Sequence, residues 1–462
     1  MSQPLAPYPD YKPAGLPWLD KVPAHWGVFK VKHLFRERSE KGYPDEPLLA
    51  ATQKQGVVLK TMVGSRTVEA SKDFHLLKLV RVGDFVISLR SFEGGIEYAH
   101  YQGIISPAYN ILTPIEPANA LYLAYLLKAK PFVESLSLFV TGIREGQNID
   151  NGKFSISFLP MPPLLEQQRI VAFLDAKGRQ IARLLRHKRQ LIKLLNEQKQ
   201  ALIHRAVTQG LDANAPHKDS GVTWLGKVPA HWEVRRIKYI LREVDSRSTT
   251  GSEVLLSMRM HHGLVPYHEH FDRPQQSSNL IDYKLVKPGQ LVINRMQAGN
   301  GVIFFSQLHG LVSPDYAVFD VINDANTTFL GEVFRNHATR KKFRSESKGL
   351  GTGTSGFLRL YTDRLGAIHL ALPPRSEQDF IIDERDARLA KTNETISRAQ
   401  REIELIQEYR TRLIADVVTG RVDVRHLSVT AVLNDVADLL DEETGEEESE
   451  EELLLETEDG RD

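Results

Sequence analysis

The sequence predicts an α+β fold with a pseudo-two-fold internal repeat, in which two similar mixed α/β domains are separated by two long antiparallel helices that form a coiled coil. Two observations predict this fold. Several motifs of the 462-residue chain recur at offsets of 206 to 211 residues. Each copy also ends in a long stretch with apolar residues at heptad spacing. At roughly 100–200 residues per domain, the length accommodates two such copies.

The first repeated motif contains all four tryptophans of the chain. Residues 15–26 (GLPWLDKVPAHW) and 221–232 (GVTWLGKVPAHW) are identical at nine of twelve positions. A large aromatic ring beside a Pro-Ala-His corner is typical of a loop that is anchored on a core. Direct contact with a ligand is the alternative interpretation. The motif marks the beginning of each copy.

Two further matches lie inside each copy. Residues 79–88 pair with 285–294, and each stretch predicts a turn followed by a β-branched strand. Residues 103–109 (GIISPAY) pair with 310–316 (GLVSPDY) at an offset of 207. The matches keep their order along the chain, so each copy is expected to have the same internal layout.

Each copy then enters a long helix through a Pro-Pro-x-x-Glu-Gln motif, which begins at Pro162 and at Pro373. The offset here is 211, so the second copy has gained a net five residues ahead of its helix. Apolar side chains at heptad spacing predict a seam along which the two helices pack on each other. The predicted seam residues are Val171, Leu174, Ile181, Leu185, Ile192, Leu195, Leu202, Ile382, Leu389, Ile396, Ala399, Ile403, Ile406 and Leu413.

These matches divide the chain into five segments. The stretch 211–220, which contains Asn214 and Pro216, is typical of a linker. The predicted segments are a first domain at 1–160 with its Trp motif at 15–26, a first long helix at 161–210, a linker plus second domain at 211–371 with its Trp motif at 221–232, a second long helix at 372–424, and an acidic C-terminal tail at 425–462.

Charge is distributed unevenly, although the whole chain has a net charge of zero. Residues 434–462 contain 15 acidic residues and one basic residue, so this tail carries −14 and the rest of the chain +14. A basic body with an acidic tail is typical of a protein that binds a polyanion. A disordered tail that only increases solubility is the alternative.

Composition excludes several classes of protein. No run approaches the roughly 18–20 apolar residues of a transmembrane helix, and the N-terminus lacks the basic-then-apolar pattern of a signal peptide. Without cysteine there is neither a disulfide framework nor a thiolate metal site. We therefore expect a cytoplasmic protein.

No catalytic motif is evident in the sequence. The glycine-rich stretch 349–353 lacks the lysine of a phosphate-binding loop. His268 and His270 would share one face of a strand and could bind zinc, but the other copy has no equivalent histidines. We expect a chain without catalytic residues, bound metal or cofactor of its own. An enzyme that uses these two histidines as metal ligands is the alternative.

With these motifs, residues 15–424 resemble the DNA-specificity (S) subunits of type I restriction-modification enzymes. The resemblance rests on the two Trp-Leu-x-Lys-Val-Pro-Ala-His-Trp motifs and the two Pro-Pro-x-x-Glu-Gln motifs, in this order and at this spacing. Members of that family carry two target recognition domains, each followed by a long helix. The resemblance therefore implies a prokaryotic restriction system in which each domain recognises one half of a bipartite, asymmetric double-stranded DNA target and the helices set the spacer.

The resemblance also implies partners. Two methyltransferase (modification) subunits would bind S-adenosylmethionine and methylate adenine at N6. Restriction/translocase subunits, with ATP and Mg, would translocate and cut DNA. A free-standing, non-enzymatic DNA-binding scaffold protein with the same architecture is the alternative function.

Polar side chains in expected loops and strand ends are the candidates for contacting DNA, because Arg pairs with guanine and Gln or Asn pairs with adenine. The candidates of the first domain are Gln53, Lys54, Arg90, Arg144, Gln147 and Asn148. Those of the second domain are Arg259, His261, Arg295, Gln297, Thr354 and Arg359.

Overall fold

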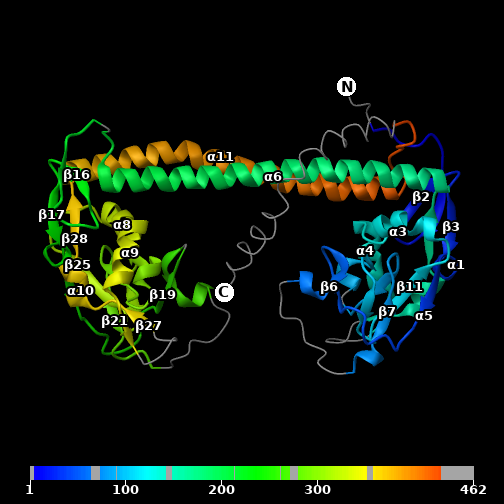
Figure 1. Cartoon of the computed structure of the whole chain (residues 1–462), viewed down its shortest axis with the longest axis horizontal. Helices are drawn as coiled ribbons and strands as arrows, with labels where there is room; N and C mark the ends of the chain where they lie inside the picture. The colour runs from blue at the N-terminus through cyan, green and yellow to red at the C-terminus, as the bar shows by residue number, and fades with distance from the viewer. Residues whose placement is uncertain are drawn as a thin grey trace. The chain divides into compact units, whose positions relative to one another are not determined.

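The computed structural model describes residues 5–63, 73–89, 91–141, 148–212, 214–260, 262–270, 279–350 and 357–427. The chain forms two compact units. Unit 1 comprises residues 1–189 and 401–462, and unit 2 comprises residues 190–400. The two long helices are α6 (Leu164–Gln209) and α11 (Arg375–Val418) (Figure 1). One part of each helix belongs to unit 1 and the other part to unit 2.

The repeat predicted from the sequence is confirmed by the strand order, because each unit has the same four-stranded antiparallel sheet. In unit 1 the order is β4 (Phe35–Arg38), β11 (Asn110–Pro114), β8 (Phe85–Ile87) and β9 (Glu97–Tyr98). In unit 2 it is β18 (Leu241–Val244), β25 (Ala317–Val321), β22 (Leu291–Ile293) and β23 (Ile303–Phe305).

Among the described residues, five two-stranded antiparallel sheets complete each unit in the same order. Unit 1 contains β1 (Tyr11–Leu16) with β2 (Leu19–Pro23), β3 (Gly27–Lys30) with β14 (Phe158–Met161), β5 (Leu49–Thr52) with β6 (Gly56–Leu59), β7 (Lys78–Val80) with β10 (Gly103–Ile105), and β12 (Val140–Thr141) with β13 (Asn148–Ile149). Unit 2 contains β15 (His217–Asp219) with β16 (Lys227–Pro229), β17 (Glu233–Arg236) with β28 (His369–Leu372), β19 (Leu256–Arg259) with β20 (Gly263–Pro266), β21 (Lys284–Val286) with β24 (Gly310–Val312), and β26 (Lys348–Leu350) with β27 (Phe357–Arg359).

Short helices connect the strands. Those of unit 1 are α1 (Val31–Leu34), α2 (Ser91–Gly94), α3 (Ala120–Leu126), α4 (Lys130–Ser135) and α5 (Asn151–Ile156), with 3-10 turns η1 (Lys60–Met62), η2 (Phe74–Leu76), η3 (Pro117–Asn119) and η4 (Leu136–Phe139). Those of unit 2 are α7 (Tyr267–His270), α8 (Thr327–Arg335), α9 (His337–Glu346) and α10 (Thr362–Ala367), with η5 (Ile237–Tyr239) and η6 (Ala298–Asn300).

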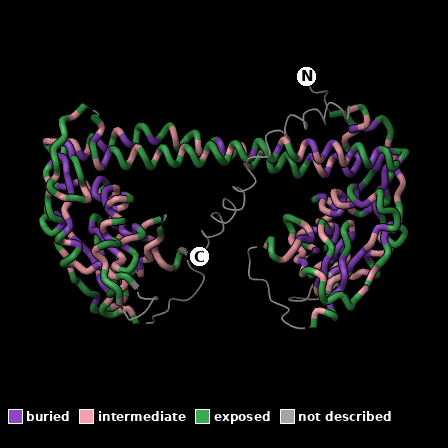
Figure 2. The backbone as a smooth tube through the Cα atoms, viewed as in Figure 1, coloured by how far each residue is buried: buried purple, intermediate pink, exposed green. Residues whose placement is uncertain are grey.

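The apolar strand of the second repeated motif is buried on both of its faces. Phe85 and Ile87 of β8 pack into one hydrophobic cluster, while Val86 packs into another on the opposite face. In β22, Leu291 likewise packs into one hydrophobic cluster and Val292 into another. Successive side chains of a strand point to opposite faces, so a strand between two cores reads as a continuous apolar run. Figure 2 shows buried residues gathered inside each unit, whereas the middle of the long helices is mostly exposed or half-buried.

The two long helices pack against each other in an antiparallel arrangement within each unit. In unit 1, Lys188 Nζ lies 2.6 Å from Glu402 Oε2, and in unit 2, Lys199 Nζ donates to Asn393 Oδ1 at 2.9 Å. The residue number rises on one helix as it falls on the other, which defines the antiparallel pairing. All fourteen apolar residues that we assigned to the seam are buried or half-buried.

The two most specific sequence motifs are bonded to each other. The indole N–H of the fully buried Trp26 donates to Glu166 Oε1 at 2.9 Å, and His25 Nε2 lies 2.7 Å from Glu166 Oε2. Trp232 donates to Glu377 Oε1 at 3.1 Å in the same manner. The Trp motif thus anchors the beginning of each copy on the first turn of its long helix, and the anchoring interpretation is confirmed.

The end of α11 and the residues that follow it contribute to the core of unit 1. Val417 and Val418 at the end of α11 belong to its core, and the hydroxyl of the buried Tyr122 donates to the Val418 carbonyl at 3.0 Å. The Asp423 N–H donates to the Ala6 carbonyl at 2.8 Å. The acidic tail from residue 428 onward lies outside the described residues.

Candidate nucleic-acid interface

By their positions in the sequence, the residues that we predicted to contact DNA fall in or at the ends of three segments that are equivalent in the two units. We call these loops the loop set: the turn between the first hairpin strands (β5–β6 or β19–β20), the segment after β8 or β22, and the hairpin β12–β13 or β26–β27. In unit 1 they hold Gln53 and Lys54, then Arg90, then Arg144, Gln147 and Asn148. In unit 2 they hold Arg259 and His261, then Arg295 and Gln297, then Thr354 and Arg359.

Several of these candidates cannot be placed. Arg90, Arg144, Gln147, His261 and Thr354 lie outside the described residues. Asn148 lies in β13, where only its backbone is described. Their role in contacting DNA stays a prediction.

In unit 1 a lysine joins two loops of the loop set. Lys128 Nζ donates to the Gln53 carbonyl at 2.8 Å and to the Gly94 carbonyl at 2.6 Å. The Gln53 side chain also covers Gly94, where an added Cβ would lie only 2.6 Å from Gln53 Cγ. Helix α2, which ends at Gly94, contacts β13 of the third loop. The described parts of the three loops of unit 1 therefore lie side by side, and Gln53 and Lys54 are exposed there.

Lys128 was not among the sequence candidates, because a single lysine after an apolar helix carries no signal of its own. Its ammonium is also 2.8 Å from Glu97 Oε1, and Glu97 is almost fully buried. Burial raises the pKa of Glu97, and the nearby Lys128 only partly opposes this effect.

We expect Glu97 to make unit 1 less stable as the pH rises. Its pKa is raised above 4.5 in the folded chain, so the folded state holds this proton more tightly than the unfolded state. The stabilisation is complete below pH 4.5 and is lost as the pH rises through the folded-state pKa. Glu97→Gln should remove this dependence of stability on pH, measured by thermal unfolding at a series of pH values from 4.5 upward. Glu93→Gln, at an exposed position, is the control, and the same change of slope in both variants would contradict the assignment.

In unit 2 the equivalent loops are joined by an arginine. The Arg295 guanidinium contacts the Glu243 carboxylate and lies 3.2 Å from Thr362 Oγ1, and its carbonyl accepts a hydrogen bond from the Leu360 N–H at 2.9 Å. Its side chain is only 16% exposed. Arg295 therefore links the segment after β22 to the end of the β26–β27 hairpin.

The other described candidates of unit 2 differ in exposure. Arg259 is half-buried at the end of β19, whereas Gln297 is exposed. Arg359 lies 3.4 Å from Asp315 Oδ1 and stacks its guanidinium over Tyr361 at 5.7 Å from the ring centroid. Gln297 is thus the described candidate of this unit that is most accessible to a ligand.

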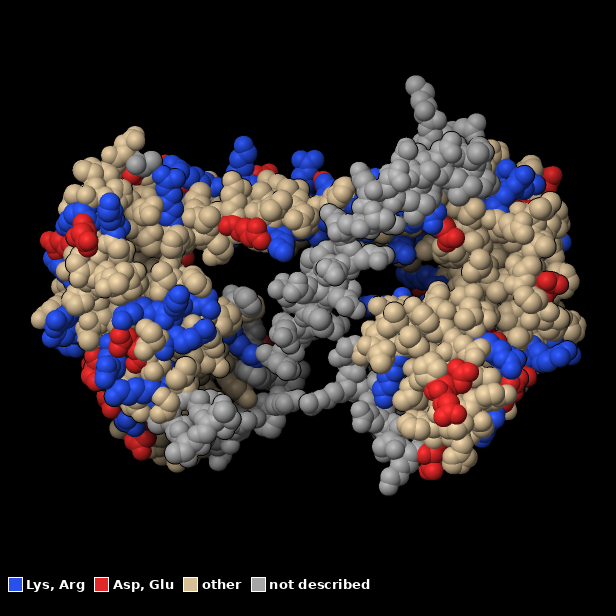
Figure 3. Space-filling model, viewed as in Figure 1, with Lys and Arg blue, Asp and Glu red and all other residues tan. Residues whose placement is uncertain are grey.

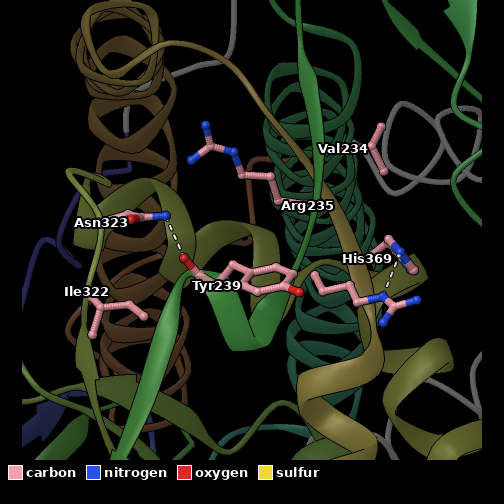
Figure 4. A pocket seen from close by; sticks show the side chains of 7 residues that line it. Val234, Arg235, Tyr239, Ile322, Asn323 and His369 are labelled. Carbon is pink, nitrogen blue, oxygen red and sulfur yellow. Dashed lines mark hydrogen bonds between the residues drawn. The ribbon is translucent and has the colours of Figure 1, made fainter.

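An open pocket of about 650 Å³ lies elsewhere in unit 2 (Figure 4). Its lining comes from β17, η5, the segment after β25 and β28, and includes Arg235, Arg236, Tyr239 and His369. Asn323 Nδ2 donates to the Tyr239 carbonyl at its rim. None of the predicted DNA contacts lines this pocket, and its seven described lining residues include no carboxylate that could act as a general base.

The metal alternative receives no support from the local fold. That alternative requires His268 and His270 to lie on a strand, whereas they belong to the short helix α7. Side chains two residues apart on a helix do not share a face. Among the described residues, no group of three or more His, Asp or Glu could hold a metal ion. In the same part of the chain, no helix is long and apolar enough to cross a membrane.

Comparison with known proteins identifies the fold. No protein-family model matches the sequence, and no curated protein gives a significant match. A chain from a structure described as "Structural basis underlying complex assembly and conformational transition of the type I R-M system" matches with a TM-score of 0.61 and 15% identity, over 87% of this chain and 99% of that chain.

Two further solved structures are similar over most of the chain. The HsdS subunit from Thermoanaerobacter tengcongensis has a TM-score of 0.46 and 14% identity, over 87% of this chain and 98% of that chain. The type I restriction-modification S subunit from M. genitalium has a TM-score of 0.30 and 13% identity, over 85% and 96%.

The fold defines a class of protein with two similar α/β domains and paired long helices. It is the fold of a type I restriction-modification chain. The fold expected from the resemblance, two similar mixed α/β domains with paired long helices, is thereby confirmed.

Proposed function

We propose that the chain is the DNA sequence-recognition subunit of a type I restriction-modification complex. Each α/β domain is a target recognition domain that binds one half of a bipartite, asymmetric DNA target. The observation that carries this proposal is the loop set, which recurs on equivalent scaffolds in both units but holds different polar residues.

The chemistry of the loop set suits this role. The scaffold strands β8 and β22 are buried on both faces, so the loops that follow them start from rigid supports. Side chains that reach base edges in the major groove discriminate between bases through paired hydrogen bonds. Gln53 in unit 1 and Gln297 in unit 2 are exposed amides that can pair with adenine in this way. Because the side chains of the two sets differ, the two half-sites have different sequences.

The long helices set the spacer in this proposal. They contain 46 and 44 residues, and at about 1.5 Å per residue each is roughly 65–70 Å long. Half-sites read from one face of B-DNA lie about 34 Å apart, or one turn. Helices of this length are therefore long enough to separate two recognition domains by that distance.

Partner subunits supply the chemistry. Two modification subunits carry S-adenosylmethionine and methylate adenine at N6, and restriction subunits that use ATP and Mg translocate and cut DNA. Apolar side chains exposed on the long helices support a docking surface for such partners. These side chains include Leu184, Leu191, Leu194, Leu405 and Tyr409.

Mapping of modified bases tests the function directly. DNA is compared from cells that express this chain with its neighbouring methyltransferase gene and from cells that lack only this chain. A two-part motif containing N6-methyladenine, present only with this chain, is the expected result. No motif, despite proven formation of the complex, would contradict the proposal and favour a free-standing DNA-binding scaffold protein.

Substitution of the exposed amides should affect one half-site at a time. Gln53→Ala should relax one base preference in the half-site of the first domain, and Gln297→Ala one in that of the second, each by roughly 1–3 kcal/mol. Relative methylation of duplexes with single base changes measures the effect. The two variants are each other's control, since loss of preference in both half-sites from one substitution would contradict separate recognition. Arg295→Ala is less suitable, because it also removes the guanidinium that contacts Glu243.

A further inference from the structure

The second copy carries a basic helix where the first does not. Helix α9 has 10 residues, and the corresponding place of unit 1 holds α4 with 6 residues followed directly by η4 with 4. Helix α9 contains Arg340, Lys341, Lys342 and Arg344. Its counterpart α4 contains one lysine, Lys130, which is 3.9 Å from Glu134. The fold common to both units therefore does not require these cations.

The basic side chains occupy the outer face of α9. Phe343 and Thr339 are buried and attach the helix to unit 2. His337, Lys341 and Arg344 are exposed and recur at four- and three-residue spacing, which places them on one face of the helix. Lys348 is exposed at the beginning of β26, two residues after the end of α9. Figure 3 shows Lys and Arg side chains gathered over the region where Figure 1 draws α9 and α10.

Helix α9 lies directly against the loop set of unit 2. A Cβ added at Gly299 would lie 3.1 Å from Arg344 Cβ, and one at Gly301 would lie 3.1 Å from Arg340 Cδ. Arg344 Nη2 donates to Asn300 Oδ1 at 2.8 Å, which ties the helix to the segment after β22. The chain then passes from α9 into the β26–β27 hairpin. The basic face thus borders two of the three loops that carry the DNA candidates.

The positive charge of this face is not neutralised. Arg340 and Arg344 bond only to the uncharged acceptors of η6, and Lys341 and Lys348 form no ion pair within the described part of the chain. By contrast, Lys342 lies 2.5 Å from Glu346. In unit 1 the cation beside the equivalent loop, Lys128, is paired with Glu97. The described cation that packs beside the loop set of unit 1 is thus paired, whereas α9 carries several that are not; within the loop set of unit 1 itself, Lys54 is exposed.

We infer that Arg340, Lys341, Arg344 and Lys348, which we call the α9 patch, bind backbone phosphates of duplex DNA beside the half-site of the second domain. This inference rests on the proposed function and adds an asymmetry to it. Phosphate contacts release condensed counterions and carry no base preference. Binding through the second domain consequently depends more steeply on salt than binding through the first, while the recognised bases depend on the loop set alone.

The test compares two charge-matched single variants of the full chain in complex with its modification subunits. Lys341→Gln removes a patch cation that lies on α9, outside the loop set. Lys287→Gln removes an exposed lysine of the same unit that lies outside both α9 and the loop set. Thermal unfolding confirms that both variants are folded. Affinity for random-sequence duplex DNA, and for a duplex with the mapped target, is then measured as a function of salt.

We expect the slope of log affinity against log salt to become shallower by about 1 in the patch variant, since each phosphate contact contributes about 0.9. The control should keep the original slope, and both variants should methylate the same motif. An equal change in both variants, or no change in the patch variant while the unsubstituted complex binds DNA, overturns the inference. Failure of the unsubstituted complex to bind duplex DNA would instead contradict the proposed function.

Discussion

Trp26→Ala is expected to destabilise unit 1 by about 3–5 kcal/mol, the usual cost of truncating a buried tryptophan. Trp26 is fully buried and packs edge-on against Tyr8 and Tyr122. Its indole also donates to Glu166, whose carboxylate would be left buried with one donor fewer. Because Glu166 lies in the first turn of α6, loss of this bond also weakens the junction between the domain and its long helix.

Denaturant or thermal unfolding of the full chain measures this effect. Trp18→Ala is the matched control, since Trp18 belongs to the same motif and loses the same atoms but is only half-buried against Phe132. We expect a clearly smaller loss of stability for Trp18→Ala. Equal losses would show that burial of the second tryptophan and its bond to Glu166 do not determine the stability of the motif.

Removal of one heptad from both long helices is expected to change the spacer of the DNA target and leave both half-sites unaltered. Residues 192–198 of α6 and 393–399 of α11 are suitable, because the Lys199–Asn393 bond shows that these segments pair within unit 2. Seven residues correspond to about 10 Å of helix, or about three base pairs at 3.4 Å each. The seam retains its heptad register, because both helices lose one whole repeat.

Mapping of methylated bases gives both half-sites and the spacer in one measurement. The control is deletion of 192–198 from α6 alone, which shifts one helix against its partner and should destabilise the pair. An unaltered spacer in an active, folded double-deletion variant would contradict a role of the helices in setting the distance. A changed half-site would contradict the separation of recognition from spacing.

Local patterns were sufficient for the architecture. The repeat and the strand after each turn at 79–88 and 285–294 follow from motif spacing and from apolar periodicity, and both are present in the structure. The long helices begin directly after the Pro-Pro pairs, at Leu164 and Arg375. Such features depend on neighbours within a few residues, so their signal is contained in a short window of sequence.

Local patterns failed where the chemistry depends on residues that are distant along the chain. The metal alternative needed His268 and His270 on one face of a strand, but their segment forms the short helix α7, which follows β20. Lys128 became part of the candidate interface because folding places it beside Gln53, 75 residues earlier. A short window of sequence around one residue does not contain the distant partner of such a contact.

The sequence alone therefore determined the duplication, the order of the elements and the two motifs that mark each copy. The tertiary structure showed that these two motifs, about 140 residues apart, are donor and acceptor of the same hydrogen bonds. It also showed which cations are neutralised, as Lys128 is by Glu97, and which are left unpaired on α9. The physical reason is that pairing of charges and satisfaction of buried polar groups depend on distances in space, and those distances exist only once the chain has folded.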